Sequence, residues 1–486
     1  MRAKPSAFWK TAAIFVIGAG SGILASVQVI PAGSVGSGTE QGPGPAGPGA
    51  VASFDPGAAG PSAGPSQVAA LDDGPSGLKC APGLNGGATD KGVTATAINL
   101  ATTVVRSGPG AAFLADVQIA MEAVVNKVNH AGGICGRQLV VTYRDDGWNS
   151  SLGQKYLRNF MQDEVFAIPV GPSSEGLNAV AKDGSGEIDE EGIPVVGTDG
   201  MLISQYTDPW FWPVAVSTAS SARLMVIQAA KKLGITDFAI VFDKNYKFGV
   251  EAAQAFNAEV KRQTGKDVEG FNEANTCKAN FCGVEAAQPT YATEINRFTG
   301  GGPNSLVAMF LEPATALTWM GNSDSPKPDA DANALVWGAQ PLFTRDFGVK
   351  CQSACDGVTV WTGYRPNIEE YQYEPALRTY VADLRATDPN VDVFNQFAQG
   401  GYVGMQLLVE ALQKVGPHLT RDRLRAVLDS MTLKTGLTVD PKLRWAEENH
   451  YAAACMQGFT INYKGTFGGW RTGATSCDPH PEYGTN

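Results

Sequence analysis

From residue 92 onward, short apolar runs alternate with amphipathic stretches, and this alternation constrains the fold more than any other feature of the sequence. Residues 97–103 form a short apolar run, and apolar side chains between Phe113 and Val128 then recur every three or four positions, as on one face of a helix. Further apolar runs follow at 139–143, 165–170 and 193–196, with a second helical stretch at 156–161. This βαβαβ order predicts a mostly parallel sheet covered by helices.

The same order begins again after residue 216. Helical patterns at 223–233 and 250–262 alternate with apolar runs at 238–242, 305–311 and 334–337, and a long helical stretch covers 371–385 and 394–415. We therefore expect an α/β protein of two Rossmann-like lobes joined by a hinge, the first formed by residues 90–216 and about 362–440, the second by 217–361 and about 441–486. Ligands bind beyond the carboxyl ends of parallel strands, so two facing lobes predict a cleft that closes on a ligand.

The N-terminus has the pattern of an export signal. Arg2, Lys4 and Lys10 precede the uncharged residues 11–32, which would span about 33 Å as a helix, enough to cross a bilayer core. The basic flank predicts a cytoplasmic N-terminus and an extracytoplasmic body. Residues 1–32 are thus a signal peptide or an uncleaved membrane anchor, and their length favours the anchor. A lipoprotein is not expected, because Val27 stands where the lipidated cysteine would be.

Residues 33–89 are expected to form a linker between this segment and the folded body. The stretch from 31 to 78 alone holds 12 Gly and 8 Pro, with too few large apolar residues to offset the entropy of ordering. Glycine does not recur at every third position, which excludes collagen. The composition predicts a disordered spacer that lets the body stand off a membrane.

All eight cysteines lie beyond the Gly/Pro-rich stretch, and an even number in an exported protein indicates disulfides. Pairing of neighbours gives Cys80–Cys135, Cys277–Cys282, Cys351–Cys355 and Cys455–Cys477. The alternative is a zinc site formed by the second and third of these pairs. No CxxC occurs and the four histidines have no ligand spacing, so we expect neither a metal nor another cofactor.

The charge balance and the motifs exclude several classes of function. The net charge is −11, and the chain beyond residue 30 carries −14, which argues against nucleic acid as a partner. Beyond the linker there is no Gly-x-Ser-x-Gly elbow, phosphate-binding loop or zinc-protease helix. We therefore do not expect an enzyme.

Several segments together resemble type I periplasmic binding proteins, in particular the branched-chain amino-acid-binding proteins of ABC transporters. The first is the run Asn-Lys-Val-Asn-His-Ala-Gly-Gly-Ile-Cys-Gly-Arg at 126–137, followed by Asp-Asp-Gly at 145–147. Further matches lie at 170–174, 192–196 and 243–249, and the resemblance covers about residues 90–470. It implies a hinged receptor that captures a small polar solute, such as an amino acid or a related amide or carboxylate, and delivers it to a membrane permease.

The resemblance also implies binding residues in the first lobe. Ser173 and Ser174 occupy the loop that holds the solute carboxylate in the family, although a serine here is equally a helix cap. Thr198 and Asp199 lie in the next binding loop. Asp199 departs from the family pattern: it could pair with a cation on the ligand, repel a carboxylate, or hydrogen-bond its own turn. Ser107 and Trp148 follow first-lobe strands and are expected to line the cleft, where Trp148 equally fits the core.

In the second lobe, Tyr246 and Phe248 stand where the family places an aromatic wall, although both could pack inside the lobe instead. Gln340 occupies the position where amino-acid binders carry a glutamate that faces the ammonium group. Because Gln340 is neutral, Glu312 or Asp199 would have to supply that charge.

A sensory ligand-binding module on the same fold is the main alternative to a transport receptor, since a tethered body suits either role. About ten residues precede the apolar segment, so a sensor would need a separate membrane partner.

Overall fold

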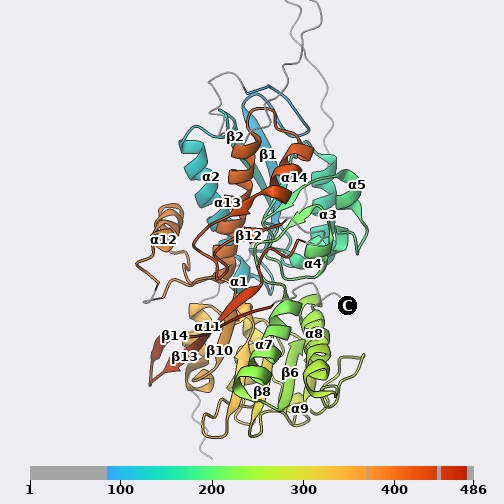
Figure 1. Cartoon of the computed structure of the whole chain (residues 1–486), viewed down its shortest axis with the longest axis vertical. Coiled ribbons are helices and arrows are strands. Elements are labelled where there is room, and N and C mark those ends of the chain that lie inside the picture. The colour runs from blue at the N-terminus through green and yellow to red at the C-terminus, as the bar shows by residue number, and fades with distance from the viewer. Residues whose placement is uncertain (1–84, 369–370, 446–449, 479–486) are drawn as a thin grey trace, which may run out of the picture. The chain divides into compact units, whose positions relative to one another are not determined.

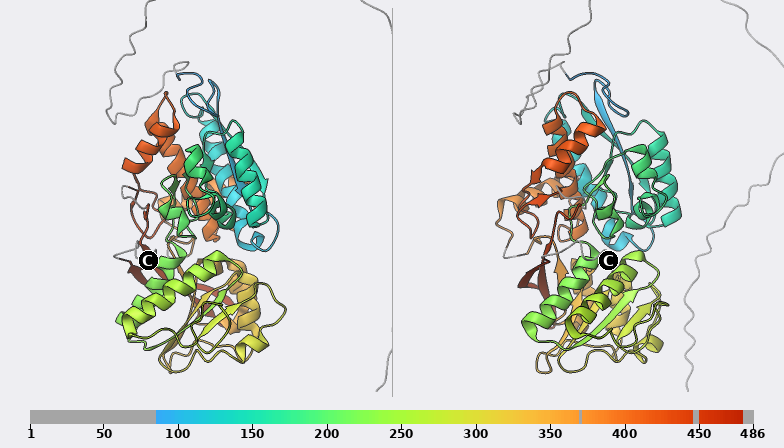
Figure 2. Two further views of the ribbon diagram at one scale, coloured as in Figure 1. Left: turned by 90° about the vertical axis from the view of Figure 1, so that its right-hand side faces the viewer. Right: turned by 45° about the vertical axis from the view of Figure 1, so that its right-hand side comes forward.

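The computed structural model describes residues 85–368, 371–445 and 450–478, which fold into two α/β lobes (Figure 1). The expected export segment and most of the expected linker lie outside these residues. Within the ranges described, no helix has both the length and the apolar composition that a bilayer crossing requires. In both views of Figure 2, the green-to-yellow segment from about residue 220 to 360 forms one lobe, whereas blue and orange segments together form the other.

Lobe 1 contains parallel strands in the order β2-β1-β3-β4-β5. The two sheets that make up this order, β1-β2 and β3-β4-β5, are joined by a single parallel bridge between Leu100 and Ala167. The strands are β1 (Ala97–Val104), β2 (Gln138–Asp145), β3 (Ile168–Pro169), β4 (Val195–Val196) and β5 (Phe211–Trp212). A short antiparallel pair, β11 (Thr432–Leu433) and β12 (Leu443–Arg444), completes the strands of this lobe.

The helices of lobe 1 come from two distant parts of the chain. Helix α13 packs directly against α2, although more than 260 residues separate them in sequence (Figure 1). The helices are α1 (Ala111–Leu114), α2 (Asp116–His130), α3 (Ser150–Gln162), α4 (Ser174–Val180), α5 (Glu187–Glu191), α6 (Ser204–Thr207), α12 (Pro375–Thr387), α13 (Gln396–Val415) and α14 (Arg421–Ser430).

Lobe 2 contains a sheet in the order β14-β13-β10-β9-β8-β6-β7, in which the strands from β7 to β10 are parallel. Every residue of β8 is buried, as expected for a strand covered by helices on both faces. The strands are β6 (Asp237–Asp243), β7 (Phe281–Val284), β8 (Ser305–Phe310), β9 (Ala334–Gly338), β10 (Thr359–Thr362), β13 (Cys455–Tyr463) and β14 (Phe467–Cys477). The helices are α7 (Thr218–Leu233), α8 (Lys247–Thr264), α9 (Ala292–Ile295), α10 (Pro313–Gly321), η1 (Gln340–Leu342), α11 (Arg345–Cys351) and η2 (Gln352–Cys355).

The two-lobed α/β architecture predicted from the apolar pattern is confirmed. The pattern did not predict β7, β10 or the antiparallel hairpin β13-β14. The outer strand of this hairpin is rich in Gly and Thr and mostly solvent-exposed, so it lacks the apolar run that marks a buried strand.

The chain crosses between the lobes near Val216, Gly363 and Cys455, and these crossings lie side by side. A Cβ atom at Gly363 would lie 3.4 Å from Cγ2 of Val216 and 3.7 Å from the carbonyl oxygen of Cys455. Just beyond, Tyr364 pairs with Thr438 in an isolated antiparallel bridge. The crossings therefore form one narrow connection, the geometry required of a hinge.

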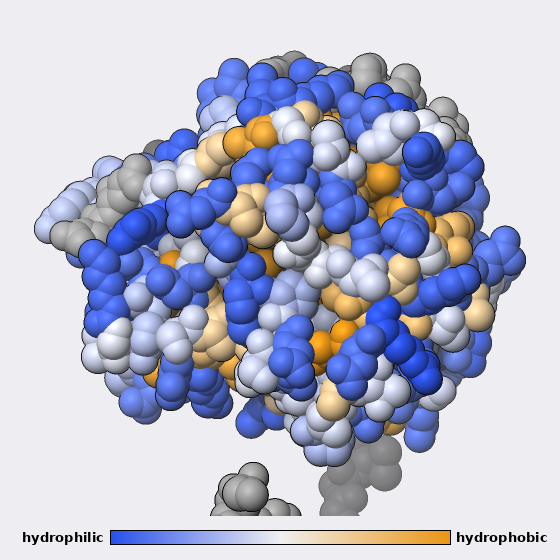
Figure 3. Space-filling model, turned by 90° about the horizontal axis from the view of Figure 1, so that it is seen from below, coloured by the Kyte–Doolittle hydropathy of each residue, from blue (hydrophilic) through white to orange (hydrophobic). Residues whose placement is uncertain are grey.

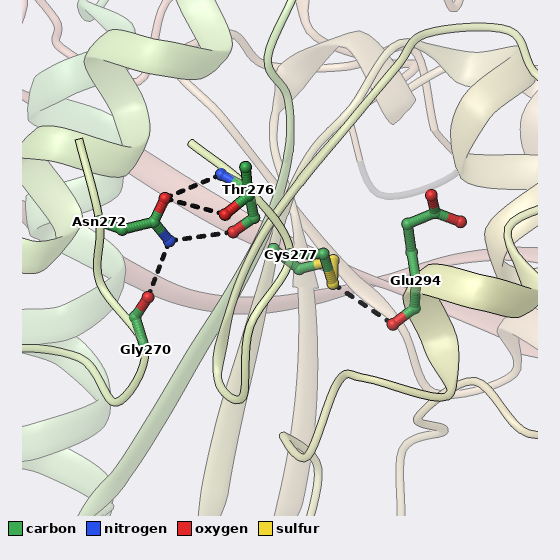
Figure 4. Close-up of a disulfide and its surroundings, with 6 residues drawn as sticks. Gly270, Asn272, Thr276, Cys277 and Glu294 are labelled. Atoms are coloured by element: carbon green, nitrogen blue, oxygen red, sulfur yellow. Dashed lines mark hydrogen bonds between the residues drawn. A yellow bond between two sulfur atoms is a disulfide. The ribbon is translucent and has the colours of Figure 1, made fainter. Parts of the chain in front are cut away.

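Three of the predicted disulfides are present: Cys277–Cys282, Cys351–Cys355 and Cys455–Cys477. Cys135 is disulfide-bonded as well, and Cys80, its expected partner, lies outside the described residues. Figure 4 shows the loop before Cys277, which Asn272 holds through hydrogen bonds to Gly270 and Thr276. Because Cys277, Cys282, Cys351 and Cys355 are all oxidised, the alternative zinc site is excluded.

Large apolar side chains on the surface are scattered. Among the described residues the exposed ones are Val140, Leu233, Phe271, Val349 and Tyr373, which lie on three different elements and two loops. On the face of lobe 2 shown in Figure 3, hydrophilic residues predominate and hydrophobic ones lie in small separate groups.

A buried arginine fastens the start of the described chain to lobe 1. Arg137 is fully buried, and its Nε donates to the carbonyl oxygen of Thr94 at 2.8 Å. The guanidinium also donates to the carbonyl oxygens of Asn85, Gly87 and Pro417. One side chain thus joins the segment at 85–94 to the loop before α14.

Replacing Arg137 with Met should lower the free energy of unfolding by about 3 kcal/mol, because several buried carbonyl groups would lose their donor. Urea unfolding measures this directly. Arg144→Met is the matched control, since Arg144 lies on β2, which directly follows Arg137, and is exposed; it should change stability by less than about 0.5 kcal/mol. Equal losses in the two variants would contradict the fastening role of Arg137.

Candidate functional site

Loops at the carboxyl ends of the parallel strands face each other across the two lobes. In lobe 1 these loops follow β1, β2, β3 and β4, and in lobe 2 they follow β6, β8 and β9. Every binding residue proposed from the sequence lies in or next to these loops. The structure shows which of these side chains line the same hollow.

A small hollow lies between the lobes and is partly open to solvent. Residues of both lobes and of the connection between them line it. The lining residues are Asp199, Met201, Val216, Thr218, Ser221, Phe248, Phe310, Ala339, Gln340, Pro341, Phe397 and Met456. Most of these side chains are apolar, and a few polar groups are placed among them, a composition typical of small-molecule sites.

The loop that carries Asp199 is held against α13 by two glycines. A Cβ atom at Gly197 would lie 2.2 Å from Cα of Gly404, so only glycine permits this approach. Gly197 also adopts a φ of +84°, which strains other residues. The close contact places Asp199 beside Phe397, which lies on the same helix as Gly404 and also lines the hollow.

Asp199 is the one lining residue among those described that carries an acidic side chain. Its Oδ1 accepts a hydrogen bond of 3.2 Å from the Met201 N–H, whereas its Oδ2 has no hydrogen-bond partner in the described part of the chain. Burial raises the pKa of Asp199 to about 7; the Met201 N–H and the Gln205 amide oppose this rise, and Glu175 adds to it. Asp199 thus hydrogen-bonds its own turn through Oδ1 and also lines the hollow.

Phe248 and Gln340 also reach the hollow, as the strand-end positions suggested. Phe248 lies in the first turn of α8 and is buried. Its helix approaches β6 closely, because a Cβ at Gly249 would lie 2.2 Å from the Asp243 carbonyl oxygen. Gln340 begins the 3-10 helix after β9 and is half-buried.

Ser173, Ser174 and Thr198 are fully buried, but none of these side chains lines the hollow. The Ser174 hydroxyl lies 3.9 Å from Sδ of Met201, which does line it. Ser173 faces Asp146, whose pKa burial raises to about 6 while the hydroxyls of Ser173 and Thr103 lower it. Neither the helix-cap hydrogen bond nor direct exposure to the hollow is observed for Ser173.

Glu312 caps a helix. Its Oε1 accepts from the Thr315 N–H at 2.6 Å and its Oε2 from the Ala314 N–H at 2.7 Å, at the first turn of α10. The sequence carried a signal for this role, because Pro313 follows at the first helical position. The Glu312 carboxylate is therefore engaged by backbone donors, and the side chain does not line the hollow.

An aromatic stack connects the two lobes beside the hollow. The ring of Trp148, which follows β2, lies 4.2 Å from that of Tyr246 and 5.9 Å from that of Phe248, nearly parallel to both. Phe113 contacts Trp148 edge-on at 5.2 Å. Trp148 and Tyr246 thus form a contact between the lobes, and neither side chain lines the hollow.

Ser107 is exposed at the end of β1, and its hydroxyl hydrogen-bonds the carboxylate of Asp145.

Polar contacts between α4 and α8 accompany the stack. Glu175 accepts a hydrogen bond of 2.8 Å from the backbone N–H of Lys247, and the Lys247 Nζ donates to Asn178 at 2.6 Å. Glu251 of α8 accepts from the Ile203 N–H of lobe 1 at 2.9 Å. Together with the aromatic stack, these bonds describe lobes closed upon each other.

The sequence did not predict most of the lining. Met201, Phe310, Ala339 and Pro341 lie within two residues of predicted strand ends or site residues, so the same strand-end rule could have found them. Thr218, Ser221, Phe397 and Met456 come from helices and a strand far away in sequence, where no local signal marks them. Among the described residues, no group of His, Cys, Asp or Glu side chains is arranged to hold a metal ion.

Comparison with known proteins matches residues 97–466 to the family model described as periplasmic binding protein. A Leu/Ile/Val-binding protein homolog 1 of Brucella melitensis is 22% identical over 345 residues, which cover 68% of this chain and 82% of that protein. Among solved structures, a fatty acid ABC transporter substrate-binding protein from Thermomonospora curvata aligns with a TM-score of 0.66 at 17% identity, covering 84% of this chain and 98% of that one. LivJ from Streptococcus pneumoniae in complex with isoleucine aligns at 0.61 and 13% identity, covering 78% and 99%.

Asp199→Asn should flatten part of the pH dependence of stability. A folded-state pKa of about 7, above the ordinary value of 3.8, means that Asp199 contributes stability at low pH that is lost as the pH rises toward 7. Relative to the wild type, the variant should gain up to about 4 kcal/mol between pH 4 and pH 8. Urea unfolding across this range measures the difference, and parallel profiles would contradict the raised pKa.

Proposed function

Because the chain belongs to the periplasmic binding protein family, we propose that it is an extracytoplasmic receptor that captures a small solute in the hollow between its lobes. The observation that carries this proposal is the lining itself, which combines side chains of lobe 1, lobe 2 and the connecting segments. Only closure of the lobes brings such residues together. A solute in the hollow would therefore stabilise the closed arrangement.

The solute we propose has an apolar body. Phe248, Phe310 and Phe397 with Met201 and Met456 form five of the twelve lining positions, and such rings and thioethers favour aliphatic groups. The names of two similar proteins mention leucine, isoleucine and valine on one hand and a fatty acid on the other, and these solutes share an aliphatic body. This supports a narrower class than the small polar solute expected from the sequence.

We further propose that the receptor delivers its solute to an ABC permease in the membrane. The support is the family and the ABC transporters named for similar structures. The role is one of binding, since the polar groups of the hollow are few and belong to Asp199, Thr218, Ser221 and Gln340. Export and tethering through residues 1–32 remain part of this proposal, on the basis of the sequence alone.

Solute should shift the lobes from open to closed. Spin labels attached at Lys155→Cys on α3 and Gln254→Cys on α8, both exposed, report the distance between the lobes. With leucine, 4-methylpentanoate and isopentylamine as probes, we expect any probe that raises the melting temperature to narrow the distribution toward its shortest distance. A probe that stabilises the protein while leaving the distribution unchanged would contradict closure.

Tyr246→Ala should weaken binding of a stabilising probe by about tenfold, because the stack of Tyr246 on Trp148 would no longer favour the closed state. Isothermal titration calorimetry measures the affinity. Tyr246→Phe keeps the ring and is the matched control, with an expected change of less than about twofold. Should Phe and Ala weaken binding equally, the stack would not be the cause.

A further inference from the structure

The hollow has an unbalanced charge. Asp199 lines it, and no lysine, arginine or histidine belongs to the lining among the described residues. An acidic solute would therefore meet a carboxyl group and no basic side chain there. A cationic solute would meet its counterion.

The free oxygen of Asp199 strengthens this argument. The side chain is only 7% exposed, and its Oδ2 accepts no well-formed hydrogen bond from any described residue, although the Gln205 amide acts on this carboxyl group. A buried polar atom without a partner is costly, and binding sites are one place where such atoms persist. A donor on the solute would satisfy this oxygen.

One acidic group and several neutral ones surround Asp199. Glu175 of α4 acts on Asp199 electrostatically, and Tyr206 of α6 and Tyr364 beyond β10 face it as neutral phenols, since burial raises the pKa of both. Lys247, the basic residue in the contact between α4 and α8, already binds Asn178 and Glu251. Asp199 is thus the one charged side chain in the described lining of the hollow.

The walls suit a cation that bears alkyl groups. Phe248, Phe310 and Phe397 present rings around the same space as Asp199, and ammonium groups are attracted to ring faces as well as to carboxylates. In contrast, the hydroxyls of Ser173 and Ser174, which the family resemblance assigned to a solute carboxylate, do not line the hollow. The described lining thus offers an anion no basic side chain, whereas it offers an ammonium group the carboxylate of Asp199.

We propose that the hollow binds an alkylammonium solute whose charged nitrogen donates to Oδ2 of Asp199 and whose aliphatic body packs against the Phe and Met side chains, without need of a carboxylate. This inference rests on the proposed receptor function and specifies its substrate class. The competing arrangement is a carboxylic acid that shares a proton with Asp199. The two arrangements respond oppositely to pH, because ionisation of Asp199 strengthens binding of the ammonium solute and abolishes the proton shared with a carboxylic acid.

The test uses three probes with the same isobutyl body: isopentylamine, 4-methylpentanoate and leucine. At about pH 8, where Asp199 is largely ionised, calorimetry should show isopentylammonium binding at least tenfold more tightly than 4-methylpentanoate. Asp199→Asn should remove this preference, to within about threefold.

Asp208→Asn is the matched control. Asp208 is also buried and accepts from the N–H two residues ahead, at Trp210, but it lies outside the lining of the hollow. It should leave the preference for the amine unchanged. Circular dichroism confirms that each variant is folded.

The outcomes separate the inference from the function beneath it. The ammonium assignment would be overturned if 4-methylpentanoate bound as tightly as isopentylamine or more tightly, or if leucine were the one probe that bound. It would also be overturned if the preference for the amine persisted in Asp199→Asn. In each of these cases the protein would still be a receptor for a small solute. Failure of all three probes to bind at millimolar concentration would contradict both the assignment and an aliphatic solute in this hollow.

Discussion

Contact between the two lobes is the interaction on which the site depends. Each sheet directs the carboxyl ends of its parallel strands toward the other lobe, so neither lobe alone can enclose a solute. Trp148 packs across this boundary against Tyr246, and Glu175 accepts from the backbone of α8. Because the described chain passes between the lobes near Val216, Gly363 and Cys455, these contacts can form and break while each lobe keeps its own core.

The same boundary explains which parts of the site could be predicted. Most strands and helices follow from apolar periodicity, and three of the residues proposed at strand ends, Asp199, Phe248 and Gln340, line the hollow. The strand-end rule does not distinguish residues that line the hollow from residues that pack behind it. Ser173 and Trp148 also follow strands, but Ser173 faces Asp146 and Trp148 faces Tyr246. Whether a side chain points into a cleft or behind it depends on packing that no local pattern encodes.

The roles of some other residues depend on contacts that the local sequence does not indicate. Phe397 enters the hollow because Gly404, on the same helix, permits contact with Gly197, two positions that lie about 200 residues apart. Glu312 differs in another way: the sequence predicts a ligand contact for this charged residue at a strand end, whereas the structure places it at the start of α10, where backbone N–H groups bind its carboxylate. In both cases a long-range contact or a backbone donor determines the role of the residue.

Methionine methyl resonances offer the most direct test of the central claim that solute binds in this hollow. Met201 and Met456 line it from the two lobes, whereas Met121 and Met320 are buried elsewhere in lobe 1 and lobe 2. In protein labelled with ¹³C at the methionine methyl groups, a bound isobutyl probe should shift the first pair strongly and the second pair little. Binding that shifts Met121 or Met320 and leaves Met201 and Met456 unchanged would contradict the account.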